Sequence, residues 1–182
     1  MNRGYSREWY LERTEAIRRI VPDCAISTDI ITGFCGETDE EHQDTVDLMK
    51  EVQYEFAYMF KYSERPKTLA ERRFKDDVPE DVKGKRLNEI IELQLASSLH
   101  WHKQQIGKVK KVLVEGKSKR SDEEWCGRDG RNSMVIFPKG AFDKGQYIFV
   151  KVTDCTSATL RGEVVSVCEP AGLVPTQSAE NL

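Results

Sequence analysis

The apolar positions in the first 63 residues recur alternately at helical and at extended spacing. Side chains three to four positions apart over residues 6–21 predict an amphipathic helix, which Pro22 ends. Residues 25–33 predict a strand that is largely enclosed on both faces, which favours a parallel strand covered by helices on one side. A capping-box sequence beginning at Thr38 predicts the start of a second helix, and a second strand is expected over 56–63. This order is typical of βα repeats. Because two strands alone bury too little apolar surface, we expect part of a larger α/β domain.

The pattern changes in the second half of the chain. A long helix is predicted to begin near Pro79 and to end near residue 105. Beyond Gly107, turn-forming residues separate the short β-rich runs KVKKVLVEGKS, MVIFP, QYIFVKVTDC and LRGEVVSV, which predicts a small closed or nearly closed β-barrel. The fold class that we expect is therefore α/β followed by all-β. A polar stretch containing Pro and Gly at 169–182 is expected to be disordered.

Charge is divided unevenly between the two halves. Residues 1–99 hold 15 Lys and Arg against 21 Asp and Glu, a balance of −6, whereas residues 100–168 hold 13 against 8, a balance of +5. A basic module joined to an acidic one favours a polyanion such as RNA as the partner of the basic half, and a merely solubilising surface is the alternative. The candidate RNA-binding cations are Lys108, Lys110, Lys111, Lys117, Lys119, Arg120, Arg128, Arg131 and Arg161. Trp125, Phe137 and Tyr147 are candidates for stacking on bases, although we expect Phe137 and Tyr147 to pack in the core.

Several function classes are disfavoured by what the sequence lacks. The five cysteines form no CxxC pair and no CxxxCxxC triplet, and an odd, scattered set indicates reduced thiols rather than a disulfide framework. No apolar run approaches the roughly 20 residues that span a bilayer, and no secretory signal is visible, so we expect a cytoplasmic protein without membrane contact. His42, His100 and His102 are expected at the solvated surface, and no metal-binding or catalytic set can be argued from them.

The stretch TDIITGFCGET, residues 28–38, is the strongest candidate for a small-molecule pocket. Asp29 lies in the first strand, and polar residues near the carboxyl ends of parallel barrel strands usually face the active site. Capping of a loop or pairing with an arginine is the alternative for this carboxylate. The two glycines of GFCGET would let a backbone approach a ligand, and the helix N-terminus that follows attracts carboxylates or phosphates. A strand-to-helix turn needs glycine in any case, so the spacing leaves both interpretations open.

In this order, the segments resemble the carboxyl-terminal part of radical-SAM methylthiotransferases. The resemblance rests on residues 1–38, on FKYSERPKT and RLNEIIELQ, and on VLVEG and CGRDGRN in the β-rich half. It covers nearly the whole chain short of the tail. It is closest to the branch that modifies (dimethylallyl)adenosine in tRNA, the MiaB type, and YSERP is more similar to the tRNA-modifying branches than to the one that modifies a ribosomal protein.

The resemblance implies a parent enzyme with an N-terminal cluster domain, a partial, TIM-like (β/α) barrel and a TRAM domain that binds tRNA. It also implies S-adenosylmethionine and two 4Fe-4S clusters as cofactors, and insertion of a methylthio group at carbon 2 of a hypermodified adenosine beside the anticodon. Residues 1–75 would be the last part of the barrel, 76–104 a linking helix and 105–168 the TRAM domain. The partner would be the anticodon stem-loop of tRNA, and we expect a monomer.

The same resemblance implies roles for particular side chains. Asp29, Gly33, Gly36 and Glu37 would line the S-adenosylmethionine side of the pocket, and Ser63 and Arg65 would lie near the target adenosine. No residue of this chain is assigned a catalytic or metal-binding role.

The chain departs from the family pattern at three points. Cys35 and Lys67 stand where the family usually has proline and glycine. The CxxxCxxC motif, whose thiolates hold the radical-SAM cluster, is absent, so we expect a fragment that binds no cluster and shows no turnover by itself. The alternatives are a stand-alone RNA-binding module on an α/β stub and a truncated gene product without a role. An upstream reading frame that encodes CxxxCxxC would decide for the enzyme.

Overall fold

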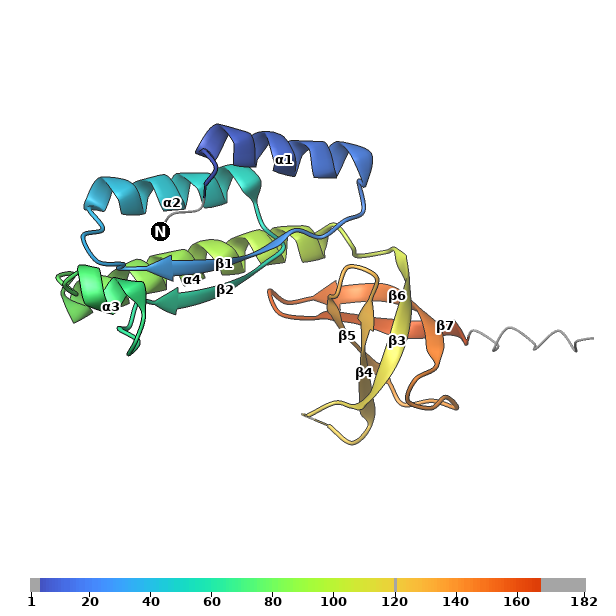
Figure 1. The fold of residues 1–182 in the computed structure, drawn as a ribbon. Helices are drawn as coiled ribbons and strands as arrows, with labels where there is room; N and C mark the ends of the chain where they lie inside the picture. Colours follow the sequence, from blue (N-terminus) through green and yellow to red (C-terminus); the bar gives the residue numbers. More distant parts are fainter. Residues whose placement is uncertain (1–3, 120, 168–182) are drawn as a thin grey trace, which may run out of the picture. The chain divides into compact units, whose positions relative to one another are not determined.

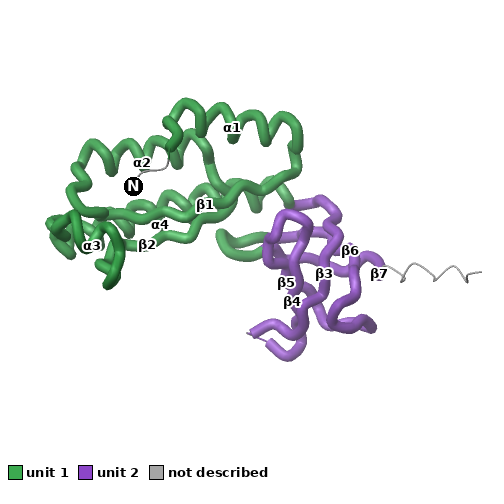
Figure 2. The backbone as a smooth tube through the Cα atoms, in the orientation of Figure 1, with its two compact units in different colours: residues 1–105, 155–159 green, residues 106–154, 160–182 purple. Residues whose placement is uncertain are grey.

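The computed structural model describes residues 4–119 and 121–167. The chain divides into two compact units, residues 1–105 with 155–159 and residues 106–154 with 160–182, which are coloured separately in Figure 2. Each unit has its own set of buried apolar side chains. The fold class expected from the sequence, α/β followed by a small β-barrel, is confirmed.

The first unit consists of four helices and a parallel sheet of two strands in its described part (Figure 1). In chain order its elements are α1 (Arg7–Ile20), β1 (Ser27–Thr32), α2 (Asp39–Val52), β2 (Phe56–Lys61), α3 (Leu69–Arg73) and α4 (Glu80–Lys103). In the sheet, Ser27 pairs with Phe56 and Thr32 with Lys61. The bounds predicted for α1, β1, β2 and α4 differ from these by at most two residues.

Side chains at the helix ends explain where the helices begin. The Ser6 hydroxyl accepts a hydrogen bond from the Trp9 N–H at the start of α1. The predicted capping box of α2 is present, with reciprocal bonds between Thr38 and Glu41. The short helix α3 was not predicted, because five residues are too few to show a helical period; its cap is the Thr68 hydroxyl.

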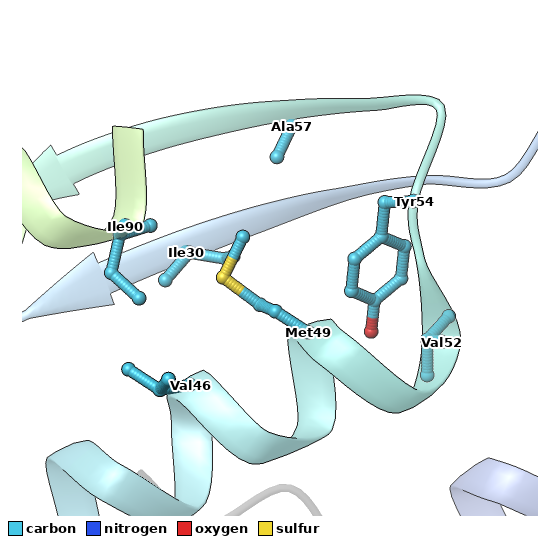
Figure 3. Close-up of a cluster of buried hydrophobic side chains, with 7 residues drawn as sticks. All are labelled: Ile30, Val46, Met49, Val52, Tyr54, Ala57 and Ile90. Carbon is cyan, nitrogen blue, oxygen red and sulfur yellow. The ribbon is translucent and has the colours of Figure 1, made fainter. Parts of the chain in front are cut away.

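The core of the first unit lies on one face of the sheet. Ile30 and Ala57 from the strands meet Val46 and Met49 of α2 and Ile90 of α4, so both helices cover the same face (Figure 3). Ile90 is completely buried.

The opposite face of the sheet is open. On this face Asp29 pairs with Tyr58 and Ile31 with Phe60, and all four residues are exposed. Phe56, Tyr58 and Phe60 are each at least 50% exposed. The prediction that the first strand is enclosed on both faces is therefore wrong for this chain, because the described residues provide cover for one face only.

Helix α4 is held against the sheet by polar bonds as well as by Ile90. The side chains of Gln94 and Ser97 donate to the Tyr54 carbonyl, at 2.9 and 2.8 Å, and Ser98 donates to the Glu55 carbonyl at 2.8 Å. These bonds satisfy buried backbone acceptors in the connection that leads into β2. The helix expected to link two domains is thus part of the first unit.

The second unit is a closed barrel of five strands in the order β3-β4-β5-β7-β6. Its strands are β3 (Val109–Lys117), β4 (Glu124–Asp129), β5 (Met134–Pro138), β6 (Tyr147–Cys155) and β7 (Leu160–Val167). Alternate side chains fill its interior, among them Val112, Val114, Phe137, Ile148 and Val150, all at most 1% exposed. Strand β5 pairs in parallel with β7, whereas its pairing with β4 is antiparallel.

Candidate cofactor pocket and nucleic-acid interface

The GFCGET turn between β1 and α2 is held by carboxylates of the chain itself. Gly33 and Gly36 both have positive φ, 72° and 76°, a region that favours glycine. The Gly33 N–H donates to Glu37 Oε2 at 2.6 Å, and the Gly36 N–H donates to Asp77 Oδ1 at 2.7 Å. Both backbone donors are therefore occupied, so the two glycines shape the turn rather than offering free N–H groups.

Gly33 also makes room for a buried lysine. A Cβ atom at this position would lie 2.4 Å from Lys83 Cγ of α4. The Lys83 side chain is 3% exposed, and its ammonium donates to both carboxylate oxygens of Asp76, at 2.6 and 2.7 Å. It also lies 5.4 Å from the centre of the Tyr62 ring. A lysine stem on α4 thus occupies the space that Gly33 leaves open.

A second buried cation, Arg86, joins α4 to the start of α2. Its guanidinium donates to Glu37 Oε2 and to Asp39 Oδ1, both at 2.7 Å, and to the Glu37 carbonyl at 3.0 Å. Burial opposes the charged form of Arg86, but the hydrogen bonds with Asp39 and Glu37 outweigh it and raise the pKa of the guanidinium. Arg86 is therefore a permanent positive charge that fixes the Glu37 carboxylate.

A cleft of about 350 Å³ lies at this junction. It is lined by Gly36, Glu37, Thr38, Asp39, Asp77, Val78, Pro79, Val82 and Arg86. Two of the predicted cofactor-binding residues, Gly36 and Glu37, belong to it, and Gly33 lies in the same turn. Asp29 does not line this cleft, because it is on the exposed face of the sheet.

Ser63 and Arg65, the predicted substrate-binding residues, are exposed in the segment that follows β2. Beside them, burial and the neighbouring Cys35 thiol raise the pKa of Tyr62 to about 12. Lys67 adopts φ 68°, in the left-handed region that favours glycine, which gives a physical reason for the glycine usual in the family at this position. The Lys67 N–H donates to Glu71 Oε2 at 2.6 Å.

Two buried cations that contact the β1–α2 turn were not predicted from the sequence. Lys83 belongs to no motif, and Arg86 begins the RLNEIIELQ segment without a role predicted for it. Both side chains reach the β1–α2 turn only through the packing of α4. The prediction that all three histidines are solvated is wrong for His42, which is 7% exposed and binds Glu89 at 2.9 Å. Among residues 4–119 and 121–167, no three His, Cys, Asp or Glu side chains are placed to hold a metal ion. Over the same residues, no helix has the length and apolarity needed to cross a membrane.

Some of the predicted RNA-binding cations of the barrel are already paired with carboxylates. Arg128 lies 3.3 Å from Glu115, Arg161 lies 3.1 Å from Glu124 and Lys117 lies 3.7 Å from Asp122. Lys110 and Arg131 also interact within the chain. Lys108, Lys111 and Lys119 are exposed, and Arg120 lies outside the described residues.

The CGRDGRN segment, residues 126–132, contains the end of β4 and the turn that leads to β5. Asp129 stabilises this turn. It is 7% exposed, and its Oδ1 accepts from the N–H groups of Arg131 and Ser133, at 3.0 and 2.8 Å. Asn132 has φ 61°, which asparagine tolerates better than most residues. The Asn132 carbonyl and side chain accept from Arg128. The motif therefore orients Arg128 and Arg131 by fixing the backbone between them.

The two aromatic residues expected in the barrel core differ in burial. Phe137 is 1% exposed, as predicted, but Tyr147 is 45% exposed. The prediction for Tyr147 is wrong because it begins β6 on the outward side of the strand, where the neighbouring Ile148 takes the inward position.

Comparison with known proteins agrees with both units. Residues 103–165 match the TRAM domain. The chain is 56% identical over 165 residues to the tRNA-2-methylthio-N(6)-dimethylallyladenosine synthase of Amoebophilus asiaticus. The matched stretch covers 90% of this chain and 34% of that protein. It is 53% identical to the synthase of the same name from Phocaeicola vulgatus, over 91% of this chain and 36% of that protein. The synthase of the same name from Chloroherpeton thalassium is 48% identical, over 91% of this chain and 37% of that protein. The chain thus spans about a third of the length of the curated relatives that it matches. The resemblance seen in the sequence is confirmed.

Proposed function

We propose that this chain, a homologue of the tRNA-2-methylthio-N(6)-dimethylallyladenosine synthases, is part of an enzyme that adds a methylthio group to carbon 2 of the hypermodified adenosine beside the anticodon. One observation carries the proposal. The identity of 56% extends over 165 residues, whereas the TRAM match covers only 103–165, so the similarity includes the α/β unit as well as the barrel. The alternative, a stand-alone RNA-binding module, accounts for the similarity of the barrel but not for that of the α/β unit.

The two units have separate tasks in this proposal. The first unit contributes part of the pocket for S-adenosylmethionine, with Asp29 on the open face of the sheet and Gly33, Gly36 and Glu37 forming the adjoining turn. Support for Asp29 comes from its exposure, which leaves the carboxylate able to accept hydrogen bonds from a ligand. Ser63 and Arg65 face the target adenosine, and the exposed cations of the barrel bind tRNA phosphates.

S-adenosylmethionine bound to a reduced 4Fe-4S cluster supplies the radical chemistry of the parent enzyme, which holds two such clusters. This chain contributes no cluster ligands in the proposal. It works in the cytoplasm on the anticodon stem-loop of tRNA. Its own residues orient the cofactor and hold the RNA, so the isolated chain is expected to show no turnover.

A chimeric enzyme tests the proposal. The matched 165 residues of the Amoebophilus asiaticus synthase are replaced by those of this chain. The chimera is then produced in a bacterial strain that lacks its own synthase, and the methylthio-modified adenosine is measured by mass spectrometry of digested tRNA. We expect modification to be restored. A soluble, cluster-loaded chimera that leaves the tRNA unmodified, beside an active parental synthase, would contradict the proposed function.

Asp29→Asn in the same chimera tests the role of this carboxylate. Loss of a charge-assisted hydrogen bond, worth about 1.5–3 kcal/mol, is expected to lower the modification rate by about tenfold or more. Ser27→Ala is the matched control, because Ser27 is exposed on the same face of β1, two residues away. Equal modification rates for Asp29→Asn and Ser27→Ala would show that the Asp29 carboxylate does not bind the cofactor.

A further inference from the structure

The outer surface of three barrel strands combines aromatic rings with cations. On β6, Tyr147, Phe149 and Lys151 alternate with the buried Ile148 and Val150, so the three side chains point outward together. On β3, Lys111 and Leu113 alternate in the same way with the buried Val112 and Val114.

The strand register places these outward side chains side by side. Tyr147 pairs with Leu113, and Leu113 pairs with Arg128 of β4. Two residues further along β6, Phe149 pairs with Lys111. We call the surface formed by Lys111, Arg128, Tyr147, Phe149 and Lys151 the Tyr147 platform.

Lys111 and Tyr147 are in direct contact on this platform. The Lys111 ammonium lies 4.6 Å from the centre of the Tyr147 ring, within the range of a cation–π interaction. The ring nevertheless remains 45% exposed. A large ring that stays open to solvent beside a cation can accept a planar ligand, which a core residue cannot do.

Two lysines of the platform differ from some of the other barrel cations in their ion pairing. Lys117 and Arg161 have carboxylate partners, whereas within residues 4–119 and 121–167 no carboxylate forms an ion pair with Lys111 or Lys151. Arg128 shares its charge with Glu115. Within the described residues, Lys111 and Lys151 can therefore bind an external anion without giving up an ion pair.

We propose that the Tyr147 platform binds single-stranded RNA, with bases stacked on Tyr147 and Phe149 and phosphates bound by Lys111 and Lys151. The proposal rests on the proposed function and names the part of the barrel that holds the RNA. Two rings at alternate positions of a strand lie about 7 Å apart, about twice the 3.4 Å rise between bases of a duplex strand. They fit successive bases only where the strand is unstacked, as in a loop.

Equilibrium binding of a fluorescein-labelled single-stranded oligoribonucleotide to the full chain tests the platform. Tyr147→Ala is expected to weaken binding by about tenfold, since stacking on an aromatic side chain is worth about 1–3 kcal/mol per base. Tyr147→Phe keeps the ring and is expected to bind as the unchanged chain does. Lys111→Ala is expected to weaken binding and to reduce the slope of log affinity against log salt by about 0.7.

Two variants serve as matched controls. Lys139→Ala removes an exposed cation that follows β5, whose Pro138 pairs with Glu124, about 13 Å along β4 from Arg128. Val165→Ala removes exposed apolar surface from β7. Both are expected to change affinity less than twofold, and all variants should keep the thermal unfolding midpoint of the unchanged chain.

An abasic oligonucleotide of the same length separates stacking from charge. Its binding should depend on Lys111 but should be the same for Tyr147→Ala and the unchanged chain. If Tyr147→Ala and Lys111→Ala bind the normal oligonucleotide like the controls, the platform is wrong, while an active chimera would still support the proposed function. If the full chain binds no single-stranded RNA, the platform is also wrong, and the chimera alone decides the function.

Discussion

Asp129 accepts hydrogen bonds from two backbone N–H groups of its own turn while it is almost fully buried. Removal of its carboxylate leaves the Arg131 and Ser133 N–H groups without this acceptor. Asp129→Ala is therefore expected to lower the free energy of unfolding by about 1–3 kcal/mol, measured by urea titration. Asp129→Asn keeps one acceptor oxygen and should cost less. Asp143→Ala, at an exposed position of another turn, is the control and should change stability by less than about 0.5 kcal/mol.

At the scale of elements, two neighbouring residues of α4 have contrasting environments. Arg86 ties the helix to the start of α2 through Glu37, whose side chain is 12% exposed. Lys85 is 80% exposed and pairs with Asp81 at 3.6 Å within its own helix. The buried pair of Arg86 and Glu37 therefore contributes to the junction between α2 and α4, beside the contact of His42 with Glu89 and the packing of Val46 and Met49 on Ile90.

Arg86→Ala is expected to destabilise the first unit by about 3 kcal/mol, because it leaves the Glu37 carboxylate buried without its cation. Lys85→Ala is expected to cost less than about 1 kcal/mol, as exposed pairs do. Chemical denaturation followed by circular dichroism compares the two. Similar losses of unfolding free energy in the two variants would show that the buried pair stabilises the unit no more than the exposed pair does.

At the scale of the whole molecule, the two units have separate cores, and we expect their unfolding to be separable. Ile90→Ala empties a fully buried site in the first unit and should lower the stability of that unit by about 2–5 kcal/mol. Gly162→Ala places a Cβ atom 2.3 Å from the Lys151 carbonyl oxygen and should destabilise the barrel by about 1–3 kcal/mol.

Hydrogen exchange measured separately over each unit distinguishes these effects, with each variant expected to raise exchange in its own unit only. Gly130→Ala is the control for Gly162→Ala, because a Cβ atom at Gly130 meets nothing within 4 Å. One shared transition that both variants lower equally would show that the units unfold together.

The sequence by itself determined the class of fold and its elements except α3 and β4. Helical and alternating periods, the capping box at Thr38 and the turn residues beyond Gly107 are local features, and each was sufficient to predict a helix, a strand or the barrel. Local periodicity works here because a side chain's face follows from its position in the element. The similarity to the synthases was also visible in the sequence, since it depends on ordered segments and not on their packing.

Only the tertiary structure decided which faces are covered and which polar groups meet. Periodicity placed Tyr147 and Phe137 among apolar residues alike, but only the closure of the barrel put one outside and the other inside. Likewise, Arg86 reaches Glu37 from a position 49 residues away, and no local pattern encodes that distance. Burial and charge pairing depend on what packs against a face, and packing is a property of residues that lie far apart in the chain.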